Sequence, residues 1–163
     1  MADEQRKTVQ EVVAPQNQKE LVATIRSRAA QILDNLSLGE TFNWVDRVSV
    51  ELTTQMLATL FDFPFEDRSK LARRSDIVCA RPGEGIINSH EQRQEKSMEC
   101  LAYFSRLWKE CEDNPVGHDL ISMMISGEAT RILSPQGYLG NVRLLNVGGN
   151  DTTRNSISDG VLT

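Results

Sequence analysis

The sequence lacks the concentrated basic charge of a nucleic-acid-binding protein. Its 163 residues include 18 Lys and Arg against 23 Asp and Glu, which gives a net charge of -5. Neutralising phosphate groups takes a basic face, whereas the basic residues here are scattered among carboxylates. We therefore expect no nucleic-acid partner.

Long apolar runs and paired cysteines are missing as well. Residues 1–6 begin no apolar stretch, so the sequence shows no secretory signal or membrane segment, and we expect a cytoplasmic protein. The cysteines, Cys79, Cys100 and Cys111, are odd in number and have no Cys-x-x-Cys spacing. This usage argues against a disulfide framework and against a zinc site, so reduced thiols are expected.

No segment alternates apolar and polar residues as a strand does, and helical periodicity fills almost the whole chain. The pattern predicts a mainly α fold. Turns rich in Gly, Pro and Asn separate the expected helices, which cover residues 3–13, 21–36, 43–60, 66–80, 91–111, 119–126 and 134–163.

The third of these helices carries two specific expectations. Asn43 is a residue type that caps helix N-termini, and it precedes an apolar face that steps by three and four residues. That face is expected to be mostly buried, and it consists of Val45, Val48, Leu52, Met56 and Leu60.

The last expected helix has a clear start and no stop signal. Ser134 is a capping residue, and Pro135 follows at the first helical position, where its missing N–H costs nothing. Continued to Thr163, the helix would have about 30 residues and a length of ~45 Å. It ends on an apolar stripe, so we expect the sequence to be an internal fragment of a longer protein.

The stretch Val-Gly-Gly-Asn-Asp-Thr-Thr at 147–153 can be interpreted in two ways. Adjacent glycines and Asn-Asp favour a loop, because each glycine costs about 1 kcal/mol inside a helix. Alternatively it is a long helix weakened at its middle, where residues without side chains let a flat cofactor or small ligand approach the backbone. In that case the Thr152 hydroxyl could bond the Gly148 carbonyl and open a small groove, and Asp151 could supply protons.

Gly-Gly-x-Asp-Thr-Thr preceded by Leu-Leu-x-Val resembles the oxygen-binding helix of cytochromes P450. The segments 43–53, 60–68 and 150–156 resemble the bacterial subfamily that hydroxylates alkanes at the chain end. The similarity spans the chain, so residues 1–163 are interpreted as an internal fragment of a single cytochrome P450 domain. The implied fold is a partial cytochrome P450 fold, running through the oxygen-binding helix.

The resemblance implies catalytic roles for Asp151 and Thr152. Thr152 matches the threonine that hydrogen-bonds dioxygen at the haem, and Asp151 matches the acid that relays protons from solvent. Gly148 and Gly149 match residues that line the distal face of the haem. The implied reaction is a monooxygenation, the insertion of one oxygen atom into a C–H bond.

Three further residues have matches in the family. Leu144 and Val147 match positions that touch substrate and would suit an aliphatic chain, although both could equally be core residues. Arg6 matches an arginine that pairs with a haem propionate, as a planar cation can. The family has a histidine four residues before that arginine, and this position is Ala2 here.

The implied cofactor is haem b, but its iron ligand is not in the sequence. Haem-thiolate enzymes hold the iron by a cysteine within Phe-x-x-Gly-x-x-x-Cys-x-Gly, and none of the three cysteines has these neighbours. No metal ligand is therefore expected among residues 1–163. The C-terminal haem-ligating part is expected to lie outside them, and the isolated chain is expected to be inactive and poorly folded.

The implied partners are a ferredoxin and a ferredoxin reductase as electron donors, and an apolar substrate such as an alkane or fatty acid. The alternative is a non-enzymatic helical interaction domain, in which residues 147–153 form a turn between two helices. A phosphate-binding glycine loop is disfavoured, because no strand precedes the glycines and no Gly-Lys-Ser or Gly-Lys-Thr follows. A continuous helix through 148–153 would contradict the loop interpretation.

Overall fold

The computed structural model describes residues 15–80, 83, 85–113, 119–128 and 130–162. All regular structure in these ranges is helical, which confirms the predicted mainly α fold. The elements are α2 (Pro15–Asp34), the π-helical η1 (Val45–Val50), α3 (Glu51–Leu60), the 3-10 helix η2 (Phe65–Asp67), α4 (Ser69–Cys79), α5 (His90–Asp113), α6 (Leu120–Ser126) and α7 (Pro135–Leu162). Arg6 and the helix expected at 3–13 lie outside the described residues.

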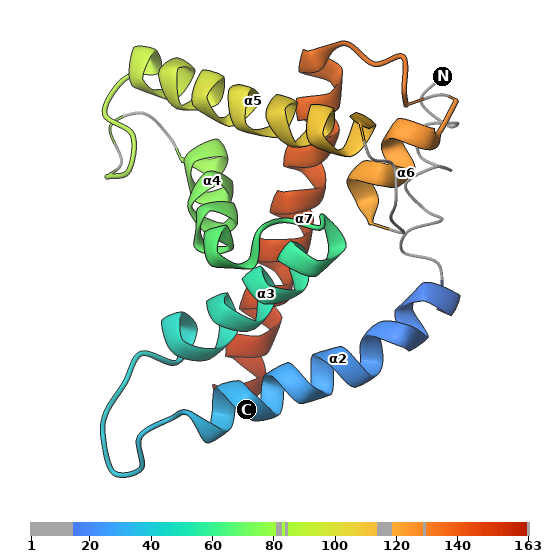
Figure 1. The fold of residues 1–163 in the computed structure, drawn as a ribbon. Helices are drawn as coiled ribbons and strands as arrows, with labels where there is room; N and C mark the ends of the chain where they lie inside the picture. The colour runs from blue at the N-terminus through green and yellow to red at the C-terminus, as the bar shows by residue number, and fades with distance from the viewer. Residues whose placement is uncertain (1–14, 81–82, 84, 114–118, 129, 163) are drawn as a thin grey trace.

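Helix α7 is the axis of the fold. It runs the length of the molecule and contacts η1, α3, α4 and α5, while α5 and α6 pack together near its first turns (Figure 1). Four elements from three parts of the sequence therefore meet on one helix. This arrangement leaves part of the α7 surface without a covering element among the described residues, as the exposed side chains along it show.

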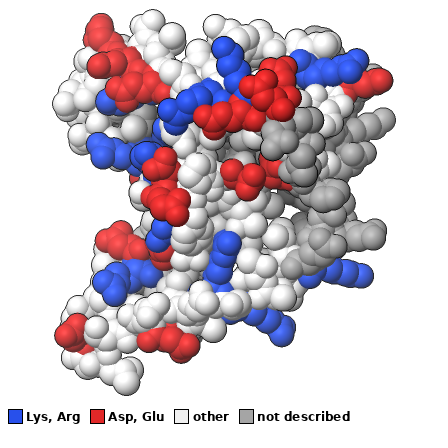
Figure 2. Space-filling model, in the orientation of Figure 1, with Lys and Arg blue, Asp and Glu red and all other residues white. Residues whose placement is uncertain are grey.

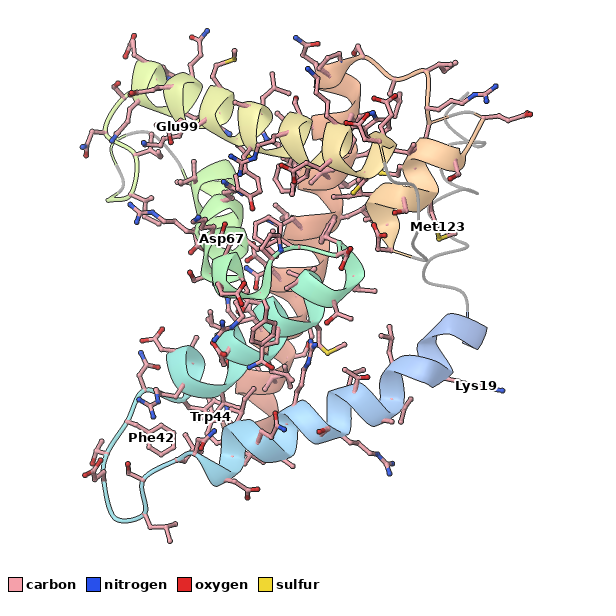
Figure 3. The ribbon with its side chains drawn as sticks, viewed as in Figure 1. Lys19, Phe42, Trp44, Asp67, Glu99 and Met123 are labelled. Carbon is pink, nitrogen blue, oxygen red and sulfur yellow. The ribbon has the colours of Figure 1, made fainter. Side chains whose placement is uncertain are left out.

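The hydrophobic core lies where α3, α4, α5, α6 and α7 converge. Its centre includes the fully buried Leu71, Phe104, Met124 and Val142, one from each of four helices. An edge-on ring contact between Trp108 and Tyr138, with centroids 4.5 Å apart, joins α5 to α7. The Tyr103 hydroxyl donates to the Asp67 carboxylate at 3.2 Å and so ties α5 to η2, beside the labelled Asp67 (Figure 3).

Helix α2 stands outside this core. It contacts α3 and η1, and Ile32 is its only buried hydrophobic residue among the described side chains. Val22 and Ile25 are 46% and 39% exposed. Lys19, on its outer surface, points away from the molecule (Figure 3). The helix is therefore attached along one side only.

The expectation for the third helix was right about its cap and wrong about its buried face. The Asn43 side-chain oxygen accepts from the Val45 and Asp46 backbone N–H groups at 3.0 and 3.4 Å. However, Val48 is the one buried residue of the five, whereas Val45 is 39% exposed and Leu52, Met56 and Leu60 are half-buried. The other buried positions of η1 and α3 are mostly small or polar, namely Ser49, Thr53, Thr54, Leu57 and Ala58. Small side chains let α3 approach α7 closely, so burial here follows packing distance rather than apolarity.

Charged groups of both signs are interspersed on the visible face, where Lys and Arg lie among Asp and Glu (Figure 2). None of the described helices is both long and apolar enough to cross a membrane.

Candidate functional site

Residues 148–153 lie inside α7, which continues unbroken from Pro135 to Leu162. The loop interpretation is therefore wrong, and the alternative prediction that the stretch is helical is confirmed. The helix survives its two glycines because one of its faces is packed: Val142, Asn146 and Asn150 are buried on it. Tertiary packing of this face outweighs the unfavourable local propensity.

The Thr152 side chain makes the hydrogen bond that the helical interpretation predicted. Its hydroxyl donates to the Gly148 carbonyl oxygen at 2.6 Å, one turn earlier. A threonine hydroxyl has one proton and two lone pairs, so a hydroxyl whose proton is engaged presents its oxygen as an acceptor. Thr152 is exposed, and this acceptor is accessible from outside α7.

Leu144, Gly148 and Thr152 form an open strip along α7. They are spaced by four residues, lie on one side of the helix and cover about 12 Å of its length. All three are exposed, Leu144 to 72%. A Cβ atom built on Gly148 would meet no other atom within 4 Å. The strip is therefore a smooth, partly apolar surface that no described residue covers.

Val147 and Asp151 form a half-buried second row beside the strip. The Asp151 carboxylate oxygen Oδ1 lies 3.2 Å from Nη2 of Arg154. The other terminal nitrogen of Arg154, Nη1, lies 3.3 Å from Oδ1 of Asp76 in α4. The two predicted catalytic residues thus occupy adjacent rows, with Thr152 on the open strip and Asp151 toward α4.

Gly149 lies on a different side of α7 from Gly148, because consecutive helical residues are about 100° apart. A Cβ built on Gly149 would lie 2.9 Å from Cδ2 of Leu57 in α3, closer than real Cβ contacts. A side chain at Gly149 would therefore displace Leu57. Its predicted part in haem binding stays a prediction, and the structure gives it a packing role that the sequence interpretation missed.

Comparison with known proteins places this chain in a family. No family model matches the chain. The steroid C26-monooxygenase of Mycolicibacterium smegmatis is 31% identical over 158 residues, which are 96% of this chain and 36% of that protein. The structure of CYP153D17 from Sphingomonas sp. PAMC 26605 is 45% identical with a TM-score of 0.83, covering 96% of this chain and 39% of that one. The chain belongs to the cytochrome P450 family.

A second solved cytochrome P450, cytochrome P450-153 from Novosphingobium aromaticivorans, is 44% identical with a TM-score of 0.77. The match covers 93% of this chain and 36% of the Novosphingobium protein. The chain thus has a partial cytochrome P450 fold, as predicted, and spans little more than a third of the length of the curated relatives it matches.

Cytochromes P450 carry haem, and the open strip suits a flat, largely apolar ring. Gly148 provides the key observation, because any side chain there would project into the space that such a ring would fill. The strip also combines apolar surface from Leu144 with the acceptor oxygen of Thr152. The residues of α7 therefore fit one face of the cofactor.

Cys100 and Cys111 are poorly suited to hold an iron ion. No group of three His, Cys, Asp or Glu side chains in the described ranges is placed to hold a metal ion. Cys100 is buried in the core and Cys111 packs against it, and burial raises the pKa of both thiols. Raised pKa values oppose the thiolate form that an iron ligand needs. The Cys79 side chain lies outside the described residues.

Three polar residues on the packed face of α7 were missed by the sequence interpretation. The Asn146 side-chain amide donates to the Leu71 backbone carbonyl of α4 at 2.9 Å, and the Thr53 hydroxyl of α3 donates to the Asn150 side-chain oxygen Oδ1 at 3.0 Å. Arg154 continues this row with its contact to α4. The signal was available, since the three residues recur every four positions. They fix the position of α7 against its neighbours.

An apolar cavity of about 620 Å³ lies between α2, α3 and α7. Its α7 wall consists of Gly149, Thr153 and Ile157, and the half-buried apolar residues of α3 face it. The predicted substrate residues Leu144 and Val147 do not line this cavity. The cavity and the open strip are therefore separate features of the fold.

Proposed function

We propose that this chain is the dioxygen-activating part of a haem-thiolate monooxygenase. The observation that carries the proposal is the Thr152–Gly148 hydrogen bond within an unbroken helix whose outer strip is open. The steroid C26-monooxygenase among its relatives is named for the same class of reaction. Haem b, when bound against the strip, would supply the binding and reductive activation of dioxygen. Its cysteine ligand would come from outside this chain.

The reaction consumes one dioxygen, two electrons and two protons: R–H + O2 + 2 e⁻ + 2 H⁺ gives R–OH + H2O. A ferredoxin, re-reduced by a ferredoxin reductase, would supply the electrons. Asp151 would carry protons to the site, because its half-buried carboxylate lies in the row next to Thr152 on α7. Thr152 would hold the final proton donor through its acceptor oxygen. Gly148 would keep the strip flat, and Arg6 would pair with a haem propionate.

The substrate we propose is an alkane or fatty acid, hydroxylated at the chain end. Leu144, which is 72% exposed, offers apolar contact at one end of the strip, and Val147 adds to it from the second row. Aliphatic side chains recognise an aliphatic substrate by burial and shape rather than by hydrogen bonds. The similarity to two cytochromes P450 of the 153 type supports this choice. The alternative of an interaction domain loses its basis, since residues 147–153 do not form a turn.

The test is Thr152→Ala in the full-length protein that contains this chain. Product formed per reducing equivalent should fall by about tenfold or more, with the remainder appearing as hydrogen peroxide, because proton delivery fails. Thr152→Ser keeps the hydroxyl and should retain most of the coupling.

Thr153→Ala is the matched control, because Thr153 is the adjacent threonine and lines the cavity instead of the strip. It should couple as the unmodified protein does. Full conversion of reducing equivalents to product in Thr152→Ala would contradict the proposed role.

A further inference from the structure

We propose that Asp76 of α4 is a positioning residue for Asp151 and acts through Arg154. The inference rests on the proposed function, because it concerns the acid that delivers protons there. Its basis is a chain of three charged side chains from two helices. Asp151 and Arg154 lie on α7, and Asp76 lies on α4, 75 residues earlier than Asp151 in the sequence.

The Arg154 guanidinium contacts two carboxylates, one on each helix. Nη1 of Arg154 lies 3.3 Å from Asp76, and Nη2 lies 3.2 Å from Asp151. The guanidinium is planar and rigid, so fixing one terminal nitrogen also restricts where the other can point. The contact with Asp76 therefore sets the direction in which Arg154 faces Asp151.

The pair within α7 is too weak to hold Asp151 by itself. Ion pairs three residues apart on a helix surface involve long side chains with many rotamers, and solvent screens them. Here the Arg154, Asp76 and Asp151 side chains are only 22%, 34% and 25% exposed, so the cluster is partly shielded from that screening. Anchoring Arg154 to a second helix removes much of its freedom.

Asp76 can hold Arg154 in place because α4 packs firmly on α7. Among the helix pairs in the described ranges, α4 and α7 make the most extensive contact. The Asn146–Leu71 hydrogen bond fixes the same two helices about two turns earlier along α7. Asp76 therefore lies on a helix that is held firmly against α7. The position of the Asp151 carboxylate depends, through Arg154, on how α4 packs on α7. A proton carrier works only within hydrogen-bond reach of its acceptor.

The test uses Asp76→Asn in the full-length protein, a change that keeps the side-chain shape and removes its charge. We expect the product formed per reducing equivalent to fall roughly fivefold, since small misplacements of a catalytic group are costly. The lost equivalents should appear as hydrogen peroxide, by O2 + 2 e⁻ + 2 H⁺ giving H2O2. Asp76→Glu, which retains the carboxylate, should recover most of the coupling. Unchanged coupling in Asp76→Asn would overturn the inference.

Glu51→Gln is the matched control. It weakens the ion pair between Glu51 and Arg68, whose side chains are 33% and 28% exposed. The hydrogen bonds of these two side chains connect residues within 51–68. This variant should lose a similar amount of thermal stability to Asp76→Asn but should keep its coupling. Equal uncoupling in both variants would show a general effect of lost ion pairs and would overturn the inference.

A double variant separates this inference from the proposed function. If Asp76 acts through Asp151, Asp76→Asn combined with Asp151→Asn should couple no worse than Asp151→Asn alone. If the double variant instead loses coupling by the product of the two single losses, Asp76 acts by another route. If Asp151→Asn itself couples fully, the proposed function fails; if it uncouples while Asp76→Asn does not, only the positioning role fails.

A crystal structure of the full-length Asp76→Asn variant gives a readout that does not depend on turnover. The inference requires that Arg154 no longer contacts Asp151 at the 3.2 Å of the intact cluster. A retained Arg154–Asp151 contact in that variant would overturn it.

Discussion

Replacing Gly148 and Gly149 by alanine, one at a time, separates the two sides of α7. Alanine favours a helix over glycine by about 0.5–1 kcal/mol when the added methyl group meets nothing. Gly148 is in this position, since a Cβ there has no neighbour within 4 Å. In the haem-free protein, Gly148→Ala should therefore raise the free energy of unfolding by up to about 1 kcal/mol.

Gly149→Ala should have the opposite effect. Its Cβ would lie 2.9 Å from Cδ2 of Leu57, a 4% exposed side chain that packs in the core and also lines the apolar cavity, so the leucine would have to shift. Overpacking of this kind costs about 1–3 kcal/mol, which exceeds the gain in helix propensity. The two variants should thus differ by about 2 kcal/mol, or roughly 30-fold in the folding equilibrium.

The assay is urea unfolding of the haem-free full-length protein, followed by haem titration of each variant. Gly148→Ala should be the more stable variant and should bind haem more weakly, because its methyl group projects from the open strip. Gly149→Ala should be the less stable one. Equal stabilities, or a Gly149→Ala variant more stable than Gly148→Ala, would refute the assignment of the two glycines to different partners.

Two other predictions concern buried groups. Asn150→Ala removes a fully buried side chain that contacts the Thr53 hydroxyl, and the cavity it leaves should lower the free energy of unfolding by about 1–3 kcal/mol. The exposed Asn155→Ala should change it by less than about 0.5 kcal/mol, and equal effects in urea unfolding would contradict this. Burial raises the pKa of the Cys100 thiol and the Tyr138 hydroxyl above their ordinary values of 9.0 and 10.0. Their neutral forms therefore favour the folded state below these values, and this stability should be lost as the pH rises further. As the pH rises above 9.0, the urea midpoint of unfolding should fall less steeply in Cys100→Ala than in the unmodified protein. An identical dependence on pH would argue against burial as the cause.

The sequence predicted the helical architecture because apolar spacing reports which segments have one packed face. It also predicted the Thr152–Gly148 bond, which depends only on local helix geometry. Local propensity pointed the wrong way at residues 147–153, since the contacts that stabilise α7 there come from Leu57, Leu71 and other residues distant in sequence.

The wrong prediction of the buried face of α3 and the overlooked packing role of Gly149 in α7 have a common physical reason. Periodicity equates burial with apolarity, whereas two helices in close contact need small residues at the contact. Ser49, Thr53 and Gly149 meet that need, and no periodicity of apolar residues marks them. The Arg154–Asp76 contact was equally hidden, because a sequence does not show which surface of α4 faces α7.

An experimental structure of the full-length protein with haem bound tests the central claim most directly. The account predicts that the ring lies over Gly148 on the open strip, with the Thr152 hydroxyl facing its centre and Gly149 still packed against Leu57. A ring bound on another side of α7, or a Gly148 face covered by protein, would contradict the assignment of the strip as the dioxygen-activating surface.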